Sequence, residues 1–398
     1  MQDFQSAAEG IREDVVAWRR DFHQHPELAF QEVRTATIVA QQLEALGMEV
    51  QTGIGKTGVI GVLEGNADGP TVMVRCDMDA LPIREQNQVD YASLKPEIMH
   101  ACGHDGHTAI GLGVARILNE QKTRIQGRIK FVFQPAEETG EGALAMIADG
   151  ALENPRPDVF VGLHLWTGLP VGEVAVPSGP SMAGADTFTV TIQGRGSHAA
   201  LPQLSADPVI CMAQTISALQ TVVSRNIDPL ETAVVSVTKL QGSHAVNIIP
   251  DEVTFAGTLR TFSAAIREQA LTRIQQIATS TAAAFGCEAT ISVDQLSMPV
   301  INDAEAASRF AARLSSAMPD LVLHRDFCVM AAEDVAYMMD RVPGVFIMVG
   351  AANSQRGLDF PHHHPRFDFD EQALVTGVAV LATAISEYVM PKEIFHEQ

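Results

Sequence analysis

The sequence is poor in aromatic residues, in basic residues and in cysteine pairs, and each shortage excludes a class of protein. Aromatics make up 6% of the 398 residues, and 27 Lys and Arg stand against 48 Asp and Glu, for a net charge of −21. A surface this acidic repels nucleic acid and anionic lipid, so neither is expected as a partner. The five cysteines are scattered and form no CxxC pair, so we expect no disulfide framework and a protein of the reducing cytoplasm.

Long apolar runs are also lacking. The longest candidate, residues 373–385, contains Thr and is shorter than the roughly 20 residues that a membrane-spanning helix needs. The N-terminus carries acids from Asp3 onward and has no apolar core of a signal peptide, so no membrane association is expected. A content of 46% hydrophobic and 19% charged residues is typical of a folded globular protein, and the length favours two domains.

The order of the predicted elements divides the chain into three stretches. Over residues 1–184, helices alternate with apolar strands, which is typical of a mainly parallel sheet covered by helices. Residues 185–295 have the order βαββαβ, which predicts an inserted ferredoxin-like domain. Over residues 296–398 the first pattern returns, so the expected fold class is α/β with one larger domain interrupted by a smaller one. The larger domain is assigned helices at residues 5–23, 32–46, 105–119 and from Glu371, and strands at 59–63, 71–75, 129–134, 159–165 and 345–350. The inserted domain is assigned strands at 187–193, 232–240, 252–261 and 288–293, and helices at 208–224 and 265–285.

Residues that bind metals or carry protons follow four strands of the larger domain and precede one helix. They are Asp77 and Asp79, Glu137 and Glu138, His164, a histidine among residues 362–364, and Cys102 with His104. Ligands of open parallel sheets bind beyond the carboxyl ends of the strands, so these side chains are expected to share one cleft.

The donor set mixes sulfur, nitrogen and oxygen, and it exceeds what a single four-coordinate zinc needs. It fits two divalent ions that share a site, lower the pKa of a water and polarise a carbonyl. Glu137 and Glu138 suit a division of labour between a ligand and a general base, and the helix N-terminus and the metal would both favour a thiolate at Cys102. A single histidine or a Glu pair is more often structural or solvated, so the prediction rests on the set as a whole.

One phosphate-binding pattern is a chance match. Residues 53–58 read GIGKTG, which fits GxGxxG, but a strand follows instead of a helix. Without a helix N-terminus the pattern builds no pyrophosphate site.

Nine ordered segments cover nearly the whole chain and resemble one family. Among them are RRDFHQHPELAFQE at 19–32, CDMDALP at 76–82, MHACGHDGH at 99–107, FQPAEETGEGA at 133–143 and HHHPRFDFDE at 362–371. They resemble the aminoacylase/carboxypeptidase/dipeptidase superfamily of binuclear metallohydrolases. The match is strongest to its amidohydrolase branch, which includes hippurate hydrolases and indoleacetyl-amino-acid hydrolases.

The resemblance implies roles for single residues. The metal ligands would be Cys102, His104, Glu138, His164 and His363. His363 is chosen because family members read ligand His, one residue, Pro, and here Pro365 follows His364, while His362 stands where an apolar residue is usual. From the residues alone, the ligand within 362–364 stays open.

Other residues would act around these ligands. Glu137 would be the general base, and His198 of the inserted domain would stabilise the oxyanion. Asn247 and Arg260 would hold the substrate carboxylate, which the fork of Arg260 matches. Asp77 and Asp79 would orient ligating imidazoles from the second shell.

The implied reaction is the hydrolysis of N-acyl amino acids, with acetyl, benzoyl or similar acyl groups, to a carboxylic acid and a free amino acid. Two divalent ions, zinc or manganese with cobalt or nickel as further candidates, would serve it. The inserted domain would act as a lid and as the contact of a homodimer or a tetramer. A dipeptidase or carboxypeptidase on the same site is an open alternative, and so is a non-catalytic metal-binding protein, although Glu137 speaks against the latter. Glu333 receives no role.

Overall fold

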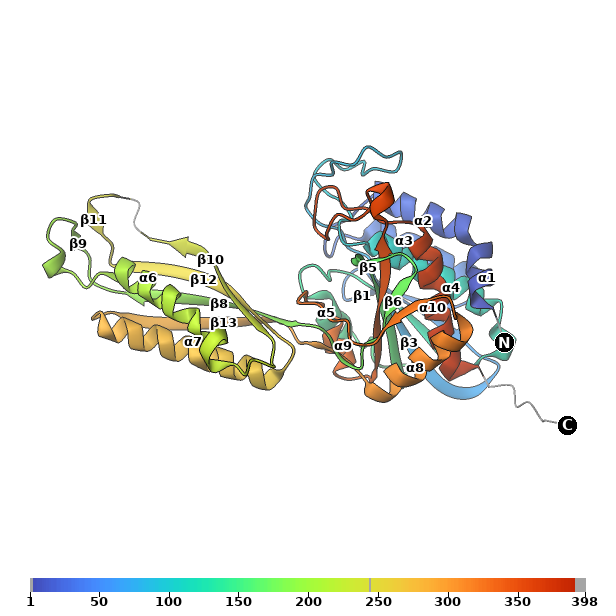
Figure 1. Cartoon of the computed structure of the whole chain (residues 1–398). Coiled ribbons are helices and arrows are strands. Elements are labelled where there is room, and N and C mark those ends of the chain that lie inside the picture. The colour runs from blue at the N-terminus through green and yellow to red at the C-terminus, as the bar shows by residue number, and fades with distance from the viewer. Residues whose placement is uncertain (1–2, 243–244, 391–398) are drawn as a thin grey trace. The chain divides into compact units, whose positions relative to one another are not determined.

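The computed structural model describes residues 3–242 and 245–390. Their contacts divide the chain into two compact units, each with its own hydrophobic core. The first unit consists of Met1–Ser181, Ile301–Cys328 and Asp334–Gln398, and the second of Met182–Val300 and Val329–Glu333. The first unit is thus built from segments that lie before and after the second in the chain (Figure 1).

The first unit contains an eight-stranded sheet with the order β1-β2-β4-β3-β5-β16-β6-β15. The strands at its centre, β4, β3, β5 and β16, are parallel to one another, which confirms the predicted mainly parallel sheet. Antiparallel pairs occur toward the edges, where β1 pairs with β2, β2 with β4, and β6 with β16. The strands are β1 (Glu49–Ile54), β2 (Gly58–Glu64), β3 (Ala67–Asp77), β4 (Gln126–Gln134), β5 (Val159–Pro170), β6 (Glu173–Ala175), β15 (Val322–His324) and β16 (Gly344–Ala352).

Two buried helices, α4 and α10, pack against each other and against β3 and β5. Close approach of α4 to the sheet requires glycine, because a Cβ on Gly111 would lie 2.6 Å from the Cys76 sulfur. The helices of this unit are α1 (Phe4–Gly10), α2 (Arg12–Gln24), α3 (Val33–Ala45), α4 (His104–Asn119), α5 (Gly142–Ala148), α8 (Ala304–Ala317), α9 (Ala336–Met339) and α10 (Gln372–Val389).

One predicted helix is broken in two, and one apolar run is longer than expected. The predicted helix over residues 5–23 is interrupted after Gly10, because Ile11 leaves helical geometry with φ −112° and donates its N–H to Ala8. Gly is a poor helix former, which explains the position of the break. The helix predicted from Glu371 is α10, Gln372–Val389. Its apolar run, expected to be too short, is long and apolar enough by composition to cross a membrane. Within the protein, however, 83% of it is buried, as in the core helix of a folded domain.

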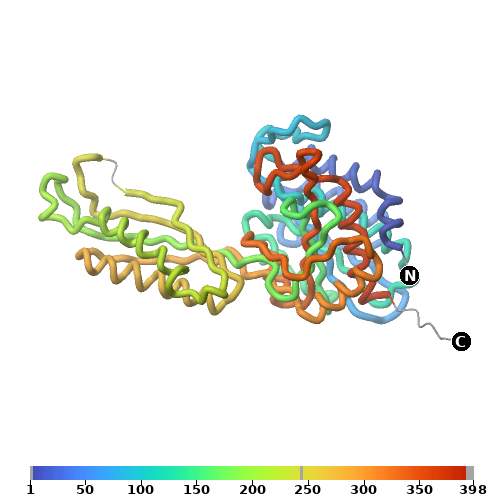
Figure 2. The backbone as a smooth tube through the Cα atoms, viewed as in Figure 1, coloured from blue at the N-terminus to red at the C-terminus, as the bar shows by residue number. Residues whose placement is uncertain are grey.

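The second unit has the order βαββαβ, with an antiparallel sheet β10-β12-β8-β13 and helices α6 and α7 packed against it (Figure 2). Its elements are β8 (Gly184–Gln193), α6 (Pro208–Leu219), β10 (Ala233–Gln241), β12 (Glu252–Thr261), α7 (Ala264–Ala284) and β13 (Glu288–Ser297). β9 (Ser197–His198), which follows β8, pairs with β11 (Ile248–Ile249), which precedes β12. The chain also forms β7 (Gly179–Met182) paired with β14 (Val300–Asn302), and the short helical turns η1 (Lys122–Arg124), η2 (Pro202–Leu204), η3 (Val222–Asn226) and η4 (Ser354–Arg356).

A buried ionic network joins α2 to the first turn of α4. Arg19 donates to Asp105 at 2.8 Å and to Asp368 at 2.8 Å, and it is fully buried. The His23 ring faces Asp105 through Nδ1 at 2.8 Å and Glu85 through Nε2 at 3.2 Å. Both ring nitrogens therefore carry hydrogen, and His23 is an imidazolium. This network holds the end of α4 from which His104 projects.

His23 should make stability depend on pH. Burial alone would lower the pKa of His23, but the hydrogen bond and charge of Asp105 outweigh it and raise the pKa to about 9. A folded pKa above the unfolded value of roughly 6.5 stabilises the protein fully below pH ~6.5, and this contribution is lost as the pH rises through about 9. We expect His23→Gln to cost up to about 3 kcal/mol of unfolding free energy at neutral pH and much less at pH ~10, measured by urea unfolding.

The quantity compared is the difference in unfolding free energy between wild type and variant at each pH. A difference is needed because burial lowers the pKa of Lys130 to about 8, so Lys130 titrates in the same range in both proteins. The half-exposed His25 provides the control: His25→Gln should give the wild-type pH dependence. An equal cost of His23→Gln at both pH values would contradict the assignment.

Candidate metal centre

The carboxyl ends of the central parallel strands carry the polar residues predicted from the sequence. Asp77 ends β3, Glu137 and Glu138 follow β4, and His164 lies in β5. The loop after β16 brings His363 to the same place, where its backbone N–H donates to Ala101 at 2.8 Å. The sheet topology thus gathers groups that are up to 286 residues apart in the sequence, from Asp77 to His363.

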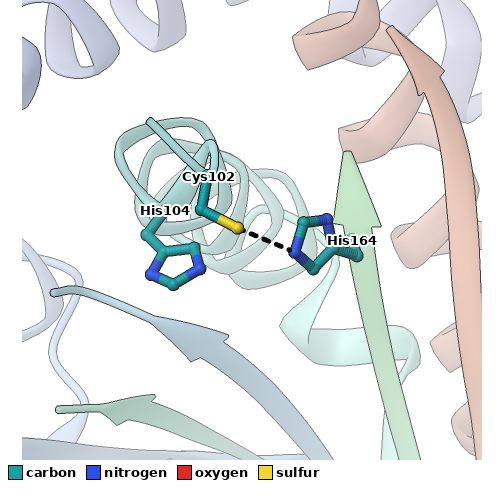
Figure 3. Close-up of side chains that lie close together, drawn as sticks. All are labelled: Cys102, His104 and His164. Atoms are coloured by element: carbon teal, nitrogen blue, oxygen red, sulfur yellow. Dashed lines mark hydrogen bonds between the residues drawn. The ribbon is translucent and has the colours of Figure 1, made fainter. Parts of the chain in front are cut away.

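Cys102, His104 and His164 form a compact group (Figure 3). Each offers one ligand atom, and these atoms lie within 4.8 Å of one another. The sulfur of Cys102 and Nε2 of His164 are 3.6 Å apart, and Figure 3 shows the His104 ring on the other side of the sulfur. All three residues are buried. This spacing is suitable for one cation with sulfur and nitrogen ligands.

A second group shares Cys102 with the first. It consists of Cys102, Glu138 and His363, again within 4.8 Å. Nε2 of His363 lies 3.3 Å from Oε2 of Glu138, and Oε1 of Glu138 lies 4.0 Å from Nε2 of His104. Two overlapping groups with a common member are the arrangement that two neighbouring ions need.

The hydrogen bonds leave the right atoms free for metals. Nδ1 of His104 donates to Asp79, at 2.9 Å to its carbonyl oxygen and at 3.2 Å to its carboxylate, so Nε2 is the ring nitrogen available to bind a metal. Nδ1 of His164 donates to the Leu165 carbonyl at 2.7 Å, which likewise frees Nε2. Over the described part of the chain, Nε2 of His104 and Oε1 of Glu138 are buried without a hydrogen-bond partner. Buried polar atoms seldom stay unpaired, so these residues fit a bound cation.

The protonation states differ from one expectation. Cys102 lies two residues before the start of α4, and burial raises the pKa of its thiol well above the ordinary value, so without a metal the helix N-terminus does not make it a thiolate. For His104, burial would lower the pKa, but the charge of Asp77 raises it well above the ordinary value. A cation entering the centre must therefore displace protons from both residues, which makes binding weaker at low pH.

The three consecutive histidines have different surroundings. His363 has a positive φ of 65° and turns Nε2 toward Glu138. His362 stacks on Trp166 with ring centroids 4.3 Å apart and donates Nε2–H to the Leu165 carbonyl at 3.0 Å. His364 stacks on Phe360 and accepts the Arg366 N–H. Among these three, His363 is the one whose ring joins a candidate ligand group.

Arg75 is a buried hub that sequence reasoning missed. Its guanidinium donates to Asp77 at 2.6 Å, to Gln134 at 2.9 Å and to Asp334 at 3.2 Å. Asp77 in turn accepts Nδ1–H of His107 at 2.6 Å, and Nε2 of His107 accepts the Leu165 N–H. A charged residue inside the apolar run of β3 was the available signal, but its partner Asp334 lies 259 residues away.

Glu137 lies between the hub and the ligands. Its side chain is 10% exposed, with Oε2 4.0 Å from Nε2 of His104. Oε1 accepts the backbone N–H of Asp334 at 3.4 Å, and both carboxylate oxygens of Asp334 accept hydrogen bonds from Gln134 and Ala143. The carboxylate of Glu137 is therefore next to the ligand groups and held by a buried framework.

The remaining predicted residues lie in the second unit. His198 is exposed, and its Nδ1 accepts the Ala200 N–H at 3.0 Å, so the neutral ring carries its proton on Nε2. Asn247 is its neighbour, because its carbonyl accepts the Ala199 N–H. Arg260 lies eight residues beyond Glu252 on β12, about 27 Å along the strand from the end next to β9 and β11. For the residues described, no ion pair involves Arg260.

Comparison with known proteins identifies the family. The family model described as peptidase family M20/M25/M40 matches residues 73–387. An N-acetylcysteine deacetylase from Bacillus subtilis is 39% identical over 382 residues, which cover 94% of this chain and 97% of that protein. The IAA-amino acid hydrolase ILR1-like 4 from Arabidopsis thaliana is 37% identical over 95% of this chain and 87% of its own length. A solved dinuclear metal-binding peptidase from Bacillus subtilis is 33% identical, with a TM-score of 0.83 over 94% of this chain and 98% of its own.

The chain belongs to peptidase family M20/M25/M40, which confirms the predicted superfamily. It is a metal-dependent amidohydrolase, and the dinuclear relative together with the two ligand groups supports a site for two divalent ions.

Replacing Arg75 should be costly for stability. Arg75→Met leaves the carboxylates of Asp77 and Asp334 buried without their cation, and breaking a buried ion pair in this way costs about 3–5 kcal/mol. Urea unfolding of the metal-free protein measures the loss. Arg128→Met, which removes an exposed pair with Glu64, should leave the unfolding curve unchanged. Equal curves for the two variants would contradict the role of Arg75 as a hub.

Cobalt can report the sulfur ligand directly. Titration of the metal-free protein with Co²⁺ should saturate at two ions per chain and produce a sulfur-to-cobalt charge-transfer band in the near ultraviolet. Cys102→Ala should remove that band, whereas Cys76→Ala, at another buried thiol, should keep it. A band that survives in Cys102→Ala would exclude Cys102 as a ligand.

Proposed function

We propose that this protein hydrolyses N-acyl amino acids, releasing a carboxylic acid and a free amino acid. The observation that carries the proposal is the position of Glu137, a carboxylate that belongs to neither sulfur-containing ligand group yet lies 4.0 Å from His104. The deacetylase and the IAA-amino acid hydrolase, both named for such amides, are 39% and 37% identical to this chain.

The metal ligands that we assign are Cys102, His104, Glu138, His164 and His363. Zinc is favoured by the Cys102 sulfur, and manganese by the carboxylates; cobalt and nickel are further candidates. When bound, two such ions lower the pKa of a water and polarise the amide carbonyl. Asp79 fixes the tautomer of His104 through Nδ1, and Asp77 fixes that of His107.

Glu137 would move the proton. Its carboxylate accepts a proton from the attacking water and then passes that proton to the amide nitrogen as the C–N bond breaks. The amine then leaves in its neutral form instead of as an anion. Oε2 of Glu137 lies toward the ligand groups, 4.0 Å from Nε2 of His104, so we assign Oε2 as the proton carrier.

Three residues of the second unit would bind the substrate. The Nε2–H of His198 is a suitable donor to the oxyanion, because Nδ1 is already occupied by the Ala200 N–H. Asn247 and Arg260 would hold the carboxylate of the amino acid. Arg260 lies far along β12 from His198 and Asn247 at the β9–β11 end. This separation favours a homodimer in which Arg260 and the pair His198 and Asn247 that serve one metal centre come from different copies.

We further propose that residues 185–295 form an inserted lid and dimerisation domain and that the protein acts in the cytoplasm. Peptide hydrolysis is the second candidate function, favoured by the solved relative named as a dinuclear metal-binding peptidase. A dipeptide and an N-acyl amino acid differ at the acyl side, where a dipeptide carries a free ammonium group. Parallel assays of N-acetyl, N-benzoyl and dipeptide substrates distinguish the two functions.

Glu137 provides the test of the reaction. Glu137→Gln should lower kcat on an N-acyl amino acid by about 10²- to 10⁴-fold with KM little changed, because a general base is lost and the ligands stay. Glu141→Gln, an exposed residue of the same loop, is the matched control and should behave as wild type. Release of free amino acid is measured before and after chelation and metal re-addition. Wild-type turnover in Glu137→Gln would exclude this mechanism.

A further inference from the structure

The loop after β4 has an unusual backbone conformation immediately before the two glutamates of the centre. Ala136 is buried and has φ +53°, in the left-handed region that a residue with a Cβ seldom adopts. Such a conformation costs about 1–2 kcal/mol and persists only where its surroundings hold it. Because Glu137 and Glu138 follow directly, the conformation of Ala136 sets the directions in which both side chains leave the chain.

Hydrogen bonds on both sides hold Ala136. Its N–H donates to Oε1 of Glu32 at 2.9 Å. Its carbonyl accepts the Gly142 N–H at 3.1 Å and the Thr139 hydroxyl at 3.2 Å. Of these bonds of Ala136, the one to Glu32 comes from outside the loop, so it joins the left-handed turn to the rest of the first unit.

The Glu32 side chain contacts three segments of that unit. Its side chain is fully buried between the loop, the turn before α3 and the β1–β2 hairpin. Oε1 also accepts the Phe30 N–H at 3.0 Å, and Oε2 accepts the Thr57 hydroxyl at 2.5 Å. Three donors thus face one carboxylate, and burying a charge is tolerated only with such complete pairing.

We propose that Glu32 is a positioning residue of the metal centre: by accepting the Ala136 N–H it holds the left-handed turn that directs Glu138 to the ligands and Glu137 to the substrate. Glu32 touches neither group itself. Its effect on metal binding does not depend on the substrate, whereas its effect on turnover rests on the proposed function.

A purely structural role would predict a different outcome, and Glu27 provides the comparison. Glu27 is also buried, lies on the same segment and accepts two backbone N–H groups, those of Arg34 and Thr35, at 3.1 and 2.9 Å. Its side-chain bonds go to α3 and not to the loop. Loss of either carboxylate should therefore lower stability similarly, but only loss of Glu32 should disturb the centre.

The experiment compares Glu32→Ala, Glu32→Gln and Glu27→Ala with the wild type. For each protein, Tm, the affinity for Zn²⁺ by competition with a chelating dye, and the absorption spectrum of the cobalt-loaded protein are measured. We expect Glu32→Ala to bind Zn²⁺ about 10- to 100-fold more weakly, the range for outer-shell partners, with an altered cobalt spectrum. Glu27→Ala should lower Tm but keep both metal readouts. Glu32→Gln should recover most of the affinity, because its amide oxygen can still accept the Ala136 N–H.

Adding Ala136→Gly tests the backbone directly. Glycine adopts the left-handed conformation without a steric cost, so the turn needs less support from Glu32. Glu32→Ala combined with Ala136→Gly should therefore recover part of the Zn²⁺ affinity that Glu32→Ala loses. If Glu32→Ala does not fold, Glu32→Asp replaces it, since it keeps the charge but is one methylene too short to reach Ala136.

A zinc affinity and a cobalt spectrum of Glu32→Ala, or of Glu32→Asp in its place, that match those of Glu27→Ala would overturn the proposal. Turnover is measured in parallel on an N-acyl amino acid, where Glu32→Ala should lower kcat more than it raises KM. Absence of turnover in the wild type would reject the proposed function, and the two metal readouts would still decide the role of Glu32.

Discussion

Buried carboxylates that accept hydrogen bonds are the interaction on which the structure of the centre depends. Asp79 holds His104 and the Glu138 N–H, Asp334 accepts from Ala143, and Glu32 accepts from Ala136. Each of these carboxylates comes from a different part of the chain. A charge removed from water is tolerated only when its oxygens are paired, so each carboxylate restricts the backbone around it to one conformation. The ligands are thereby held on loops that would otherwise be free to move.

The same principle explains the cations of the interior. Arg75 pairs with Asp77 and Asp334, and Arg19 pairs with Asp105 and Asp368, all of them buried. The two networks lie on either side of His104, one joined to it through Asp77 and the other through its neighbour Asp105. Ligands that are already held in place lose little conformational entropy when a metal binds. The observed affinity is therefore reduced little by the cost of ordering them.

Local pattern in the sequence was sufficient to predict the strands that end at the centre. Apolar runs predicted β3, β4, β5 and β16, because strands buried in a parallel sheet are apolar on both faces. Helical periodicity predicted α4. The break at Ile11 could not be predicted in this way, since helical periodicity continues across it. The residues alone left the choice among the three histidines open, and His363 was chosen from the family resemblance. In the structure His363 has a positive φ, and partners occupy the rings of His362 and His364.

The sequence could not predict the residues that position the ligands without touching them, because their partners lie far away in the chain. Arg75 and Asp334, or Glu32 and Ala136, are 259 and 104 residues apart, and nothing local in either segment indicates the other. The segment quoted above for residues 19–32 includes Glu32 without distinguishing it from its neighbours. Only the fold shows that the carboxylate of Asp334 faces the buried guanidinium of Arg75.

The position of β16 has a consequence for synthesis of the protein. This strand lies between β5 and β6 in the sheet, yet the ribosome makes it only after the whole second unit. An emerging chain can therefore complete the second unit while the sheet of the first still lacks a central strand. His363 emerges later still, so the candidate group of Cys102, Glu138 and His363 cannot assemble before β16 has been made.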